Sequence, residues 1–211
     1  MSVGYYPIFL DLADRACLVV GGGPVAERKV ESLLAVGAHV TVVSPTVTAR
    51  LAAWAAAGRI AHRARAYRVG DLAGARIAFA ATDDAAVTEA VAADARARGV
   101  WVNAADEPAR CDFILPSVIR RGRLTVAVSS GGASPVAARA IREELEGYLT
   151  ERHAALVDLA ADARADLRAR AVSASPRRWQ RALGDRRVRR LIADGRYRRA
   201  RRMLTRSLES T

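Results

Sequence analysis

The stretch Gly21-Gly22-Gly23-Pro24-Val25-Ala26 decides the fold, because it stands directly after the apolar run Ala16–Val20 (ACLVV). Such a run is typical of a buried parallel strand, and the apolar residues from position 25 to 36 recur at helical spacing. In a strand–turn–helix unit of this spacing, the first glycine allows a tight turn and the second lets the backbone approach a pyrophosphate. The stretch therefore predicts a dinucleotide-binding turn at the start of a helix, and a glycine turn without a ligand is the alternative.

Strands and helices alternate from residue 16, just before this turn, to residue 104. Strands are predicted at residues 16–20, 39–43, 59–66, 76–81 and 100–104, with helices at residues 25–36, 46–57 and 85–98. This alternation predicts an α/β fold, with a Rossmann-type parallel sheet covered by helices on both faces.

The pattern changes after residue 104. Two strands, at residues 111–115 and 124–129, are joined through Arg121-Gly122 with no helix between them. From Ser134 onward the pattern indicates only helices, which are broken near residues 173–176, Gly184 and Gly195. We predict an NAD-binding domain at residues 1–113, a small strand-rich segment at 114–148 and a C-terminal helical domain at 149–211.

Candidate cofactor-binding residues follow the strands, because open α/β sheets bind ligands beyond the carboxyl ends of their strands. They are Gly21, Gly22, Gly23, Pro24, Val25, Ser44, Pro45, Thr82, Asn103 and Ala104. The second strand ends in Ser44-Pro45-Thr46, without the acidic residue that commonly binds the ribose 2′-hydroxyl. Hydroxyls and backbone would therefore hold the ribose, and the choice between NAD and NADP stays open.

The candidate catalytic residue is Asp106, which lies just beyond a predicted strand end. A carboxylate there can accept a proton as a hydride leaves a substrate. Capping of the Glu107-Pro108 turn is the alternative role. Asn103 is the only asparagine and Lys29 the only lysine of this arginine-rich chain, so we hypothesise that both positions need their particular side chain. Chance is the alternative for either residue alone.

A second candidate site is the loop at residues 129–135. Its small residues leave backbone N–H groups free at a helix start, where Ser134 is the expected N-cap and Pro135 the first helical residue. Such a loop suits a carboxylate or a phosphate. The predicted substrate-binding residues are Ser129, Ser130, Gly131, Gly132 and Arg139. A plain capped loop at a dimer contact is the alternative.

The net charge of +12 is concentrated near the end of the chain, where residues 164–206 hold 16 arginines against three aspartates. Such a field attracts polyanions: nucleic acid, an anionic membrane surface or a small molecule with many carboxylates. A solvated helical face, with arginine favoured by codon composition, is the alternative. Because aromatic residues are few, we expect no nucleic-acid partner.

Other features narrow the function class further. No apolar run is long enough to span a membrane, and the first residues do not resemble a signal peptide, so we expect no membrane partner. Cys17 and Cys111 form no CxxC pair, which favours reduced thiols and a cytoplasmic location. Cys17 is expected to pack as a small hydrophobe. The three histidines are scattered, so we expect no resident metal site.

Six motifs together resemble one family. They are Tyr6-Pro7-Ile8-Phe9-Leu10, residues 21–29 (GGGPVAERK), 80–84 (AATDD), 102–106 (VNAAD), 111–117 (CDFILPS) and 128–135 (VSSGGASP). In order and spacing they resemble precorrin-2 dehydrogenase, which also occurs as the N-terminal part of multifunctional sirohaem synthase. The resemblance covers about residues 5–150, and the helical tail matches loosely, in its arginines and Trp179.

The resemblance implies NAD-dependent dehydrogenation of precorrin-2 to sirohydrochlorin in sirohaem biosynthesis, in a cytoplasmic homodimer. It implies that residues 114–148 serve dimerisation and that Asp106 matches the family's proposed catalytic aspartate. Precorrin-2 carries eight carboxylates, which suits an arginine-rich neighbourhood. Some family members also insert iron, and for this chain that activity stays open. The main rival is an NAD-sensing regulatory module without turnover, which would explain the glycine turn but not Asp106 beside Asn103.

Overall fold

A computed structural model describes residues 4–105 and 107–209 of the protein. The chain divides into two compact units, Met1–Ile114 and Leu115–Thr211.

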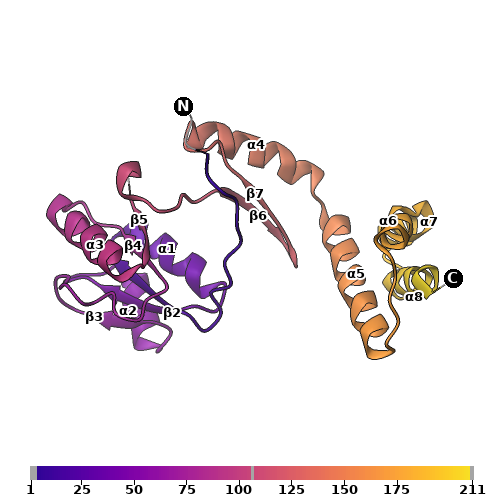
Figure 1. Ribbon diagram of the computed structural model, residues 1–211, viewed down its shortest axis with the longest axis horizontal. Coiled ribbons are helices and arrows are strands. Elements are labelled where there is room, and N and C mark those ends of the chain that lie inside the picture. Colours follow the sequence, from indigo (N-terminus) through magenta and orange to yellow (C-terminus); the bar gives the residue numbers. More distant parts are fainter. Residues whose placement is uncertain (1–3, 106, 210–211) are drawn as a thin grey trace. The chain divides into compact units, whose positions relative to one another are not determined.

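The first unit is built on a five-stranded parallel sheet of order β3-β2-β1-β4-β5 (Figure 1). The strands are β1 (Ala16–Val20), β2 (His39–Val43), β3 (Ala61–Arg63), β4 (Ile77–Ala80) and β5 (Trp101–Ala104). The helices are α1 (Pro24–Leu34), α2 (Ala49–Ala56) and α3 (Ala85–Arg98), and a short 3-10 helix, η1, spans Pro108–Arg110. The predicted Rossmann-type fold is confirmed.

Side chains alternate across the sheet and build a separate core on each face. Along β1, Cys17 and Val19 face α1 and α2, while Leu18 and Val20 face α3. The expected role of Cys17 is confirmed, because its side chain is buried and burial raises the pKa of its thiol to about 11. Both cysteines of the chain are free thiols.

One predicted strand is wrong. Residues 111–115 form no strand, and the first strand of the hairpin is instead β6 (Ser117–Arg121). The segment is fastened beside β5 by isolated bonds: Asp112 and Val102 exchange two of them, with the Asp112 carboxylate accepting from the Val102 N–H at 2.8 Å. The Asn103 amide also donates to the Phe113 carbonyl at 3.0 Å. Because a side chain occupies the edge position, no regular ladder forms there.

The second unit contains the antiparallel hairpin of β6 with β7 (Leu124–Val128), followed only by helices. These are α4 (Pro135–Tyr148), α5 (Glu151–Ala169), α6 (Pro176–Gly184), α7 (Arg186–Ala193) and α8 (Tyr197–Glu209). The predicted N-cap of α4 is confirmed, since the Ser134 hydroxyl accepts from the Ala137 N–H at 3.1 Å. Leu159, Val188 and Leu204 lie in one apolar core shared by α5, α7 and α8.

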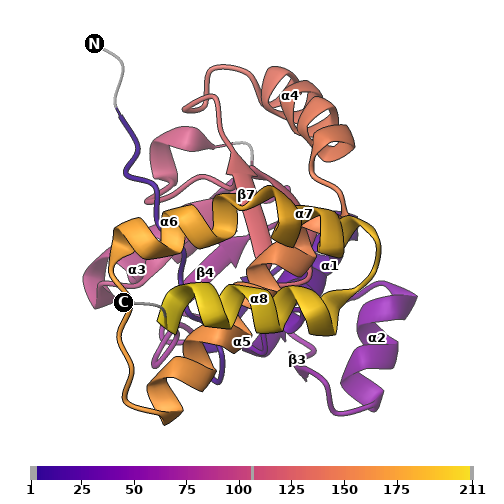
Figure 2. The same cartoon turned by 90° about the vertical axis from the view of Figure 1, so that its right-hand side faces the viewer.

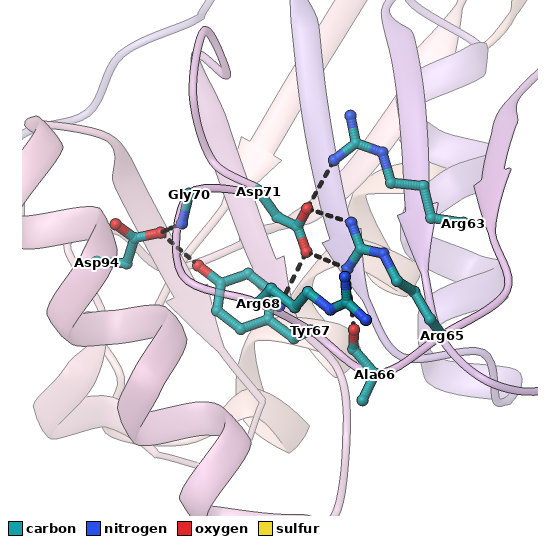
Figure 3. Close-up of polar contacts among 8 residues, drawn as sticks. All are labelled: Arg63, Arg65, Ala66, Tyr67, Arg68, Gly70, Asp71 and Asp94. Carbon is teal, nitrogen blue, oxygen red and sulfur yellow. Dashed lines mark hydrogen bonds and ion pairs between the residues drawn. The ribbon is translucent and has the colours of Figure 1, made fainter.

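The connection from β3 to β4 contains no helix, and two aspartates hold it in place (Figure 3). Asp71 binds the guanidinium groups of Arg63 and Arg65 at 2.7 and 2.6 Å, and its side chain is only 6% exposed. The hydrogen bond from Arg65 is the main reason why the pKa of Asp71 lies well below its ordinary value.

Asp94, on α3, anchors the same connection from the other side. Its carboxylate accepts from the Tyr67 hydroxyl at 2.7 Å and from the Gly70 N–H at 2.8 Å, and it pairs with Arg98. Burial alone would raise the pKa of Asp94, but these hydrogen bonds outweigh burial and lower it. Hydrogen bonds to these two carboxylates thus hold the helix-free connection from β3 to β4 in place.

We expect Asp94→Ala to lower the free energy of unfolding by about 3 kcal/mol, because it leaves the partly buried Tyr67 hydroxyl and Gly70 N–H without an acceptor and Arg98 without its ion pair. Tyr67→Phe, which removes one hydrogen bond, should cost only about 1 kcal/mol. Urea titration followed by circular dichroism measures both. Equal transition midpoints for wild type and Asp94→Ala would contradict this role.

The same two carboxylates predict a loss of stability in acid. Their pKa values are lower in the folded chain than the ordinary 3.8, so their contribution is fully present above that value. It should disappear as the pH falls further and the folded carboxylates are protonated. Thermal unfolding measured between about pH 6 and pH 2.5 should show a steeper decline for wild type than for Asp94→Asn. Parallel profiles would contradict the prediction.

Candidate nucleotide-binding site

The glycine turn between β1 and α1 has the geometry that a pyrophosphate requires. Gly21 has φ +121°, and a Cβ there would lie 2.0 Å from the Ala81 carbonyl oxygen. A Cβ at Gly22 would lie 1.9 Å from the Thr46 carbonyl oxygen, whereas a Cβ at Gly23 would meet nothing within 4 Å. The first two positions therefore need glycine for the fold, and the third is open on the side where a ligand can approach.

The first turn of α1 is suited to an anion. Gly23 is the N-cap and Pro24 follows it, and no side chain caps the N-terminus. The positive end of the helix dipole and the N–H groups of the first turn thus face the glycine turn. Phosphate groups commonly bind in this arrangement.

The loop after β2 is fastened to the glycine turn. The Thr48 N–H donates to the Gly22 carbonyl at 2.9 Å, and the Thr48 hydroxyl donates to Glu27 at 2.6 Å. Ser44 is buried and its hydroxyl donates to the Thr46 carbonyl at 2.7 Å. The predicted ribose-binding segment is therefore held rigidly beside the turn, and the Ser44 hydroxyl proton is already used within the loop.

Strand register brings the predicted cofactor-binding residues to one edge of the sheet. Val20 of β1 pairs with Val43 and with Ala80, and Ala80 pairs with Ala104. The residues that follow these four, including Gly21, Ser44 and Thr82, consequently share the carboxyl edge. Pro45 follows in the loop after β2, and Pro24 and Val25 are the first two residues of α1.

Asn103 and Lys29 both lie on the α1 side of β4 and β5. The Asn103 amide donates to the Phe113 carbonyl, so part of its bonding capacity holds the segment after η1. The Lys29 ammonium lies 5.6 Å from the centroid of the Phe79 ring, which meets Phe113 edge to face. At both positions the side chain has a partner that the sequence pattern did not reveal.

Asp106 lies outside the described residues, but the backbone on either side of it is described. The Ala105 N–H donates to the Ala80 carbonyl at 2.9 Å, which ties this loop to the end of β4. Arg110 pairs with Glu107 at 2.8 Å and with Glu89 at 2.7 Å. The loop that carries position 106 is thus anchored at the carboxyl edge.

Sequence reasoning missed the part that Cys111 plays in this loop. Its thiol accepts from the Ala104 N–H at 3.2 Å and lies 3.4 Å from the Glu107 carbonyl oxygen. Burial raises the pKa of this thiol, so Cys111 stays neutral. Its contacts connect Ala104, before position 106, with Glu107, after it. The only sequence signal was its place in an apolar stretch seven residues after Ala104.

The predicted substrate-binding loop belongs to the second unit. The Ser130 hydroxyl donates to the Ser134 carbonyl and accepts from the Ser134 N–H, which closes the loop on itself. Gly131 and Gly132 have positive φ values of 63° and 85°. Arg139 pairs with Glu143 at 3.0 Å. The Ser129 hydroxyl accepts from the Gly131 N–H. The loop is thus preformed, but the expectation that its backbone N–H groups are free is wrong for Gly131, Ala133 and Ser134, whose N–H groups already bond Ser129 and Ser130.

Residues 4–105 and 107–209 contain no cluster of three or more His, Cys, Asp or Glu side chains that could hold a metal ion. Within the same ranges, no helix is both long and apolar enough to cross a membrane. A hollow of about 740 Å³ lies at the amino edge of the sheet, beside Arg15 and Arg76, and so on the side away from the glycine turn.

Comparisons with known proteins agree with this geometry. Residues 8–117 match the family described as "Putative NAD(P)-binding", and residues 121–148 match the family described as "Sirohaem biosynthesis protein central". The siroheme synthase of Methylobacillus flagellatus is 46% identical over 176 residues, which are 82% of this chain and 38% of that protein. The siroheme synthase of Thioalkalivibrio sulfidiphilus is 41% identical over 208 residues, 98% of this chain and 42% of that protein.

The chain thus spans less than half the length of these curated relatives. A solved structure, "SirC, precorrin-2 dehydrogenase", is covered over 100% of its length by 96% of this chain, with a TM-score of 0.75 and 28% identity. The resemblance seen in the sequence motifs is confirmed. The chain is related to siroheme synthases and to a precorrin-2 dehydrogenase. Because the match over residues 8–117 covers more than half of the chain, the chain belongs to this NAD(P)-binding family.

Proposed function

We propose that this chain is an NAD-dependent precorrin-2 dehydrogenase of sirohaem biosynthesis. In the reaction, precorrin-2 and NAD⁺ give sirohydrochlorin, NADH and a proton, and bound NAD⁺ supplies the hydride acceptor. The observation that carries the proposal is the glycine turn, whose backbone is open at Gly23 and adjoins an uncapped helix start. The structural likeness to a precorrin-2 dehydrogenase supports the choice of substrate.

The glycine turn and the neighbouring strand ends would bind the dinucleotide. The backbone N–H groups of Gly22, Gly23 and Val25, at and just before the start of α1, suit the pyrophosphate; Pro24 has no N–H to donate. Ser44 and Pro45 flank the expected ribose position. Thr82, Asn103 and Ala104 lie at or near the ends of β4 and β5, where we expect the nicotinamide to bind. No carboxylate follows β2, so the backbone of this loop takes a larger share of ribose binding.

Asp106 would act as the base that removes the proton when the hydride leaves. Its support is the anchoring of the flanking residues Ala105 and Glu107 at the carboxyl edge, together with the family resemblance. A carboxylate in that position can accept the proton directly from the macrocycle. The negative charge of the ring's carboxylates suits Arg139 as the main substrate-binding group, beside Ser129, Ser130, Gly131 and Gly132, because the Gly131 N–H already bonds Ser129.

The remaining parts of the proposal concern organisation. We propose a dinucleotide-binding domain at residues 1–113, a dimerisation segment at 114–148, a helical domain at 149–211 and a homodimeric assembly. Exposed apolar side chains on the second unit, such as Val118, Val136 and Ile141, support a contact between subunits. The two free thiols support a cytoplasmic location. The proposed reaction requires neither a nucleic acid nor a membrane as partner.

Anaerobic incubation with precorrin-2 and either NAD⁺ or NADP⁺ tests the proposal. Sirohydrochlorin should form with one NADH per macrocycle, followed by the absorption spectra of both products. Binding of NAD⁺ without any turnover would instead favour the NAD-sensing module. Parallel reactions with added Fe²⁺ or Co²⁺ decide whether the chain also inserts a metal ion.

A further inference from the structure

The helices α6, α7 and α8 form the end of the second unit (Figure 2), and their sequence is rich in arginine. Residues 177–206 contain thirteen arginines and two acidic residues, Asp185 and Asp194. Among the described residues, Arg201 is paired with Asp162 and Asp166, while the exposed arginines of α7 form no ion pair. The Asp185 carboxylate is used to cap the N-terminus of α7.

The packing of the helices explains why these charges face outward. Val188 and Ile192 of α7, and Ala200, Leu204 and Leu208 of α8, repeat at helical spacing and are fully or almost fully buried. The arginines between them consequently lie on the opposite side of each helix. The arginines are thus carried by helices that pack in a common apolar core.

One part of this surface is concave. A hollow of about 700 Å³ lies where α7 turns into α8, and four arginines line it together with Gly195 and Tyr197. These arginines are Arg196, Arg198, Arg199 and Arg202, and all four are exposed. Tyr197 is 47% exposed and offers the hollow one aromatic face.

We propose that this arginine hollow binds a tetrapyrrole through its ring carboxylates, as a docking site built entirely within the second unit. The choice of occupant rests on the proposed function. Guanidinium groups bind carboxylates by paired hydrogen bonds, and several carboxylates around one compact ring match several arginines around one hollow. Tyr197 can pack against the ring itself.

Two other classes of polyanion fit the surface less well. From α5 to residue 209 the exposed large apolar side chains are Val172 and Tyr197, so an apolar face for insertion into a membrane is lacking in this described range. A single-stranded nucleic acid is commonly bound by several aromatic side chains along a groove, whereas the hollow has one.

The test is direct binding of uroporphyrin, a stable ring with eight carboxylates, followed by its fluorescence. In the triple variant R198Q/R199Q/R202Q the affinity should fall about tenfold or more, and added salt should weaken wild-type binding. The matched control R186Q/R187Q/R190Q removes the same charge from α7, outside the hollow, and should change the affinity less than about threefold. Deuteroporphyrin, with two carboxylates, should bind weakly to all three proteins.

Several outcomes would overturn the docking site. Equal losses in the two triple variants would show that only diffuse charge matters. A short single-stranded RNA, or anionic vesicles, could also displace uroporphyrin. A dissociation constant for either competitor that is lower than the one for uroporphyrin would assign the surface to that partner instead. NAD⁺ titration of the same variants keeps the two proposals apart, because it reports on the glycine turn and not on the hollow.

Discussion

Asp106→Ala is expected to lower the rate of precorrin-2 dehydrogenation by roughly 100-fold or more, which is the effect of losing a general base. The affinity for NAD⁺ should stay nearly unchanged, because the proposed dinucleotide-binding groups are the glycine turn and the neighbouring strand ends. Single-turnover kinetics measures the chemical step, and a separate titration measures NAD⁺ binding.

Asp83→Ala provides the matched control for this variant. Asp83 is also an aspartate close to the carboxyl end of a strand, and its side chain is exposed. Its replacement should change turnover less than about threefold, as expected for a surface substitution. Wild-type turnover in Asp106→Ala would remove this residue from the mechanism.

Gly23→Ala should weaken NAD⁺ binding by about tenfold or more while leaving the fold intact. A Cβ at this position meets no protein atom within 4 Å, and its φ of −85° suits any residue. The free energy of unfolding should therefore change by about 1 kcal/mol or less. The added methyl group would occupy the space into which the pyrophosphate must come. Calorimetric titration with NAD⁺ and thermal unfolding give the two values.

Gly22→Ala separates a loss of binding from a loss of folding. There the new Cβ would lie 1.9 Å from the Thr46 carbonyl oxygen, so the loop after β2 must move. We expect this variant to lose about 1–3 kcal/mol of stability, as overpacked sites do. Wild-type NAD⁺ affinity in Gly23→Ala would mean that the pyrophosphate is not bound against this turn.

The parallel sheet could be predicted because its strands are short apolar runs bounded by turn residues. β1 and β4 are almost entirely buried, and a strand buried on both faces is continuous in its hydrophobicity. The helix starts at Asp84 and Ser134 could likewise be predicted, because N-capping depends on neighbouring residues alone.

The hairpin of the second unit was harder to predict, for a physical reason. In β6 only Ile119 is buried, so its residues show no alternation of apolar and polar side chains. Residues 111–115 have a more strand-like apolar pattern. They form no strand, because hydrogen bonds of the Asp112 and Asn103 side chains hold them in an irregular conformation. Patterns of apolar residues predict burial, and in these two segments burial does not coincide with strand formation.

Within the site, the backbone chemistry of the glycine turn followed from the sequence, but the side-chain partners did not. Asn103 binds the Phe113 carbonyl ten positions further along the chain, and outside the site Asp94 likewise binds Tyr67 across 27 positions. Such pairings depend on how the chain turns back on itself. The role of Cys111 beside the loop of Asp106 was missed for the same reason.

Hydride transfer from precorrin-2 to bound NAD⁺ is best tested by following a label from substrate to cofactor. Precorrin-2 fully deuterated at the carbon that loses the hydride would be incubated with NAD⁺ and this chain without oxygen, and the NADH analysed by mass spectrometry. Each NADH should gain one deuterium. NADH without deuterium, or sirohydrochlorin formed without reduction of NAD⁺, would contradict direct hydride transfer at the glycine turn.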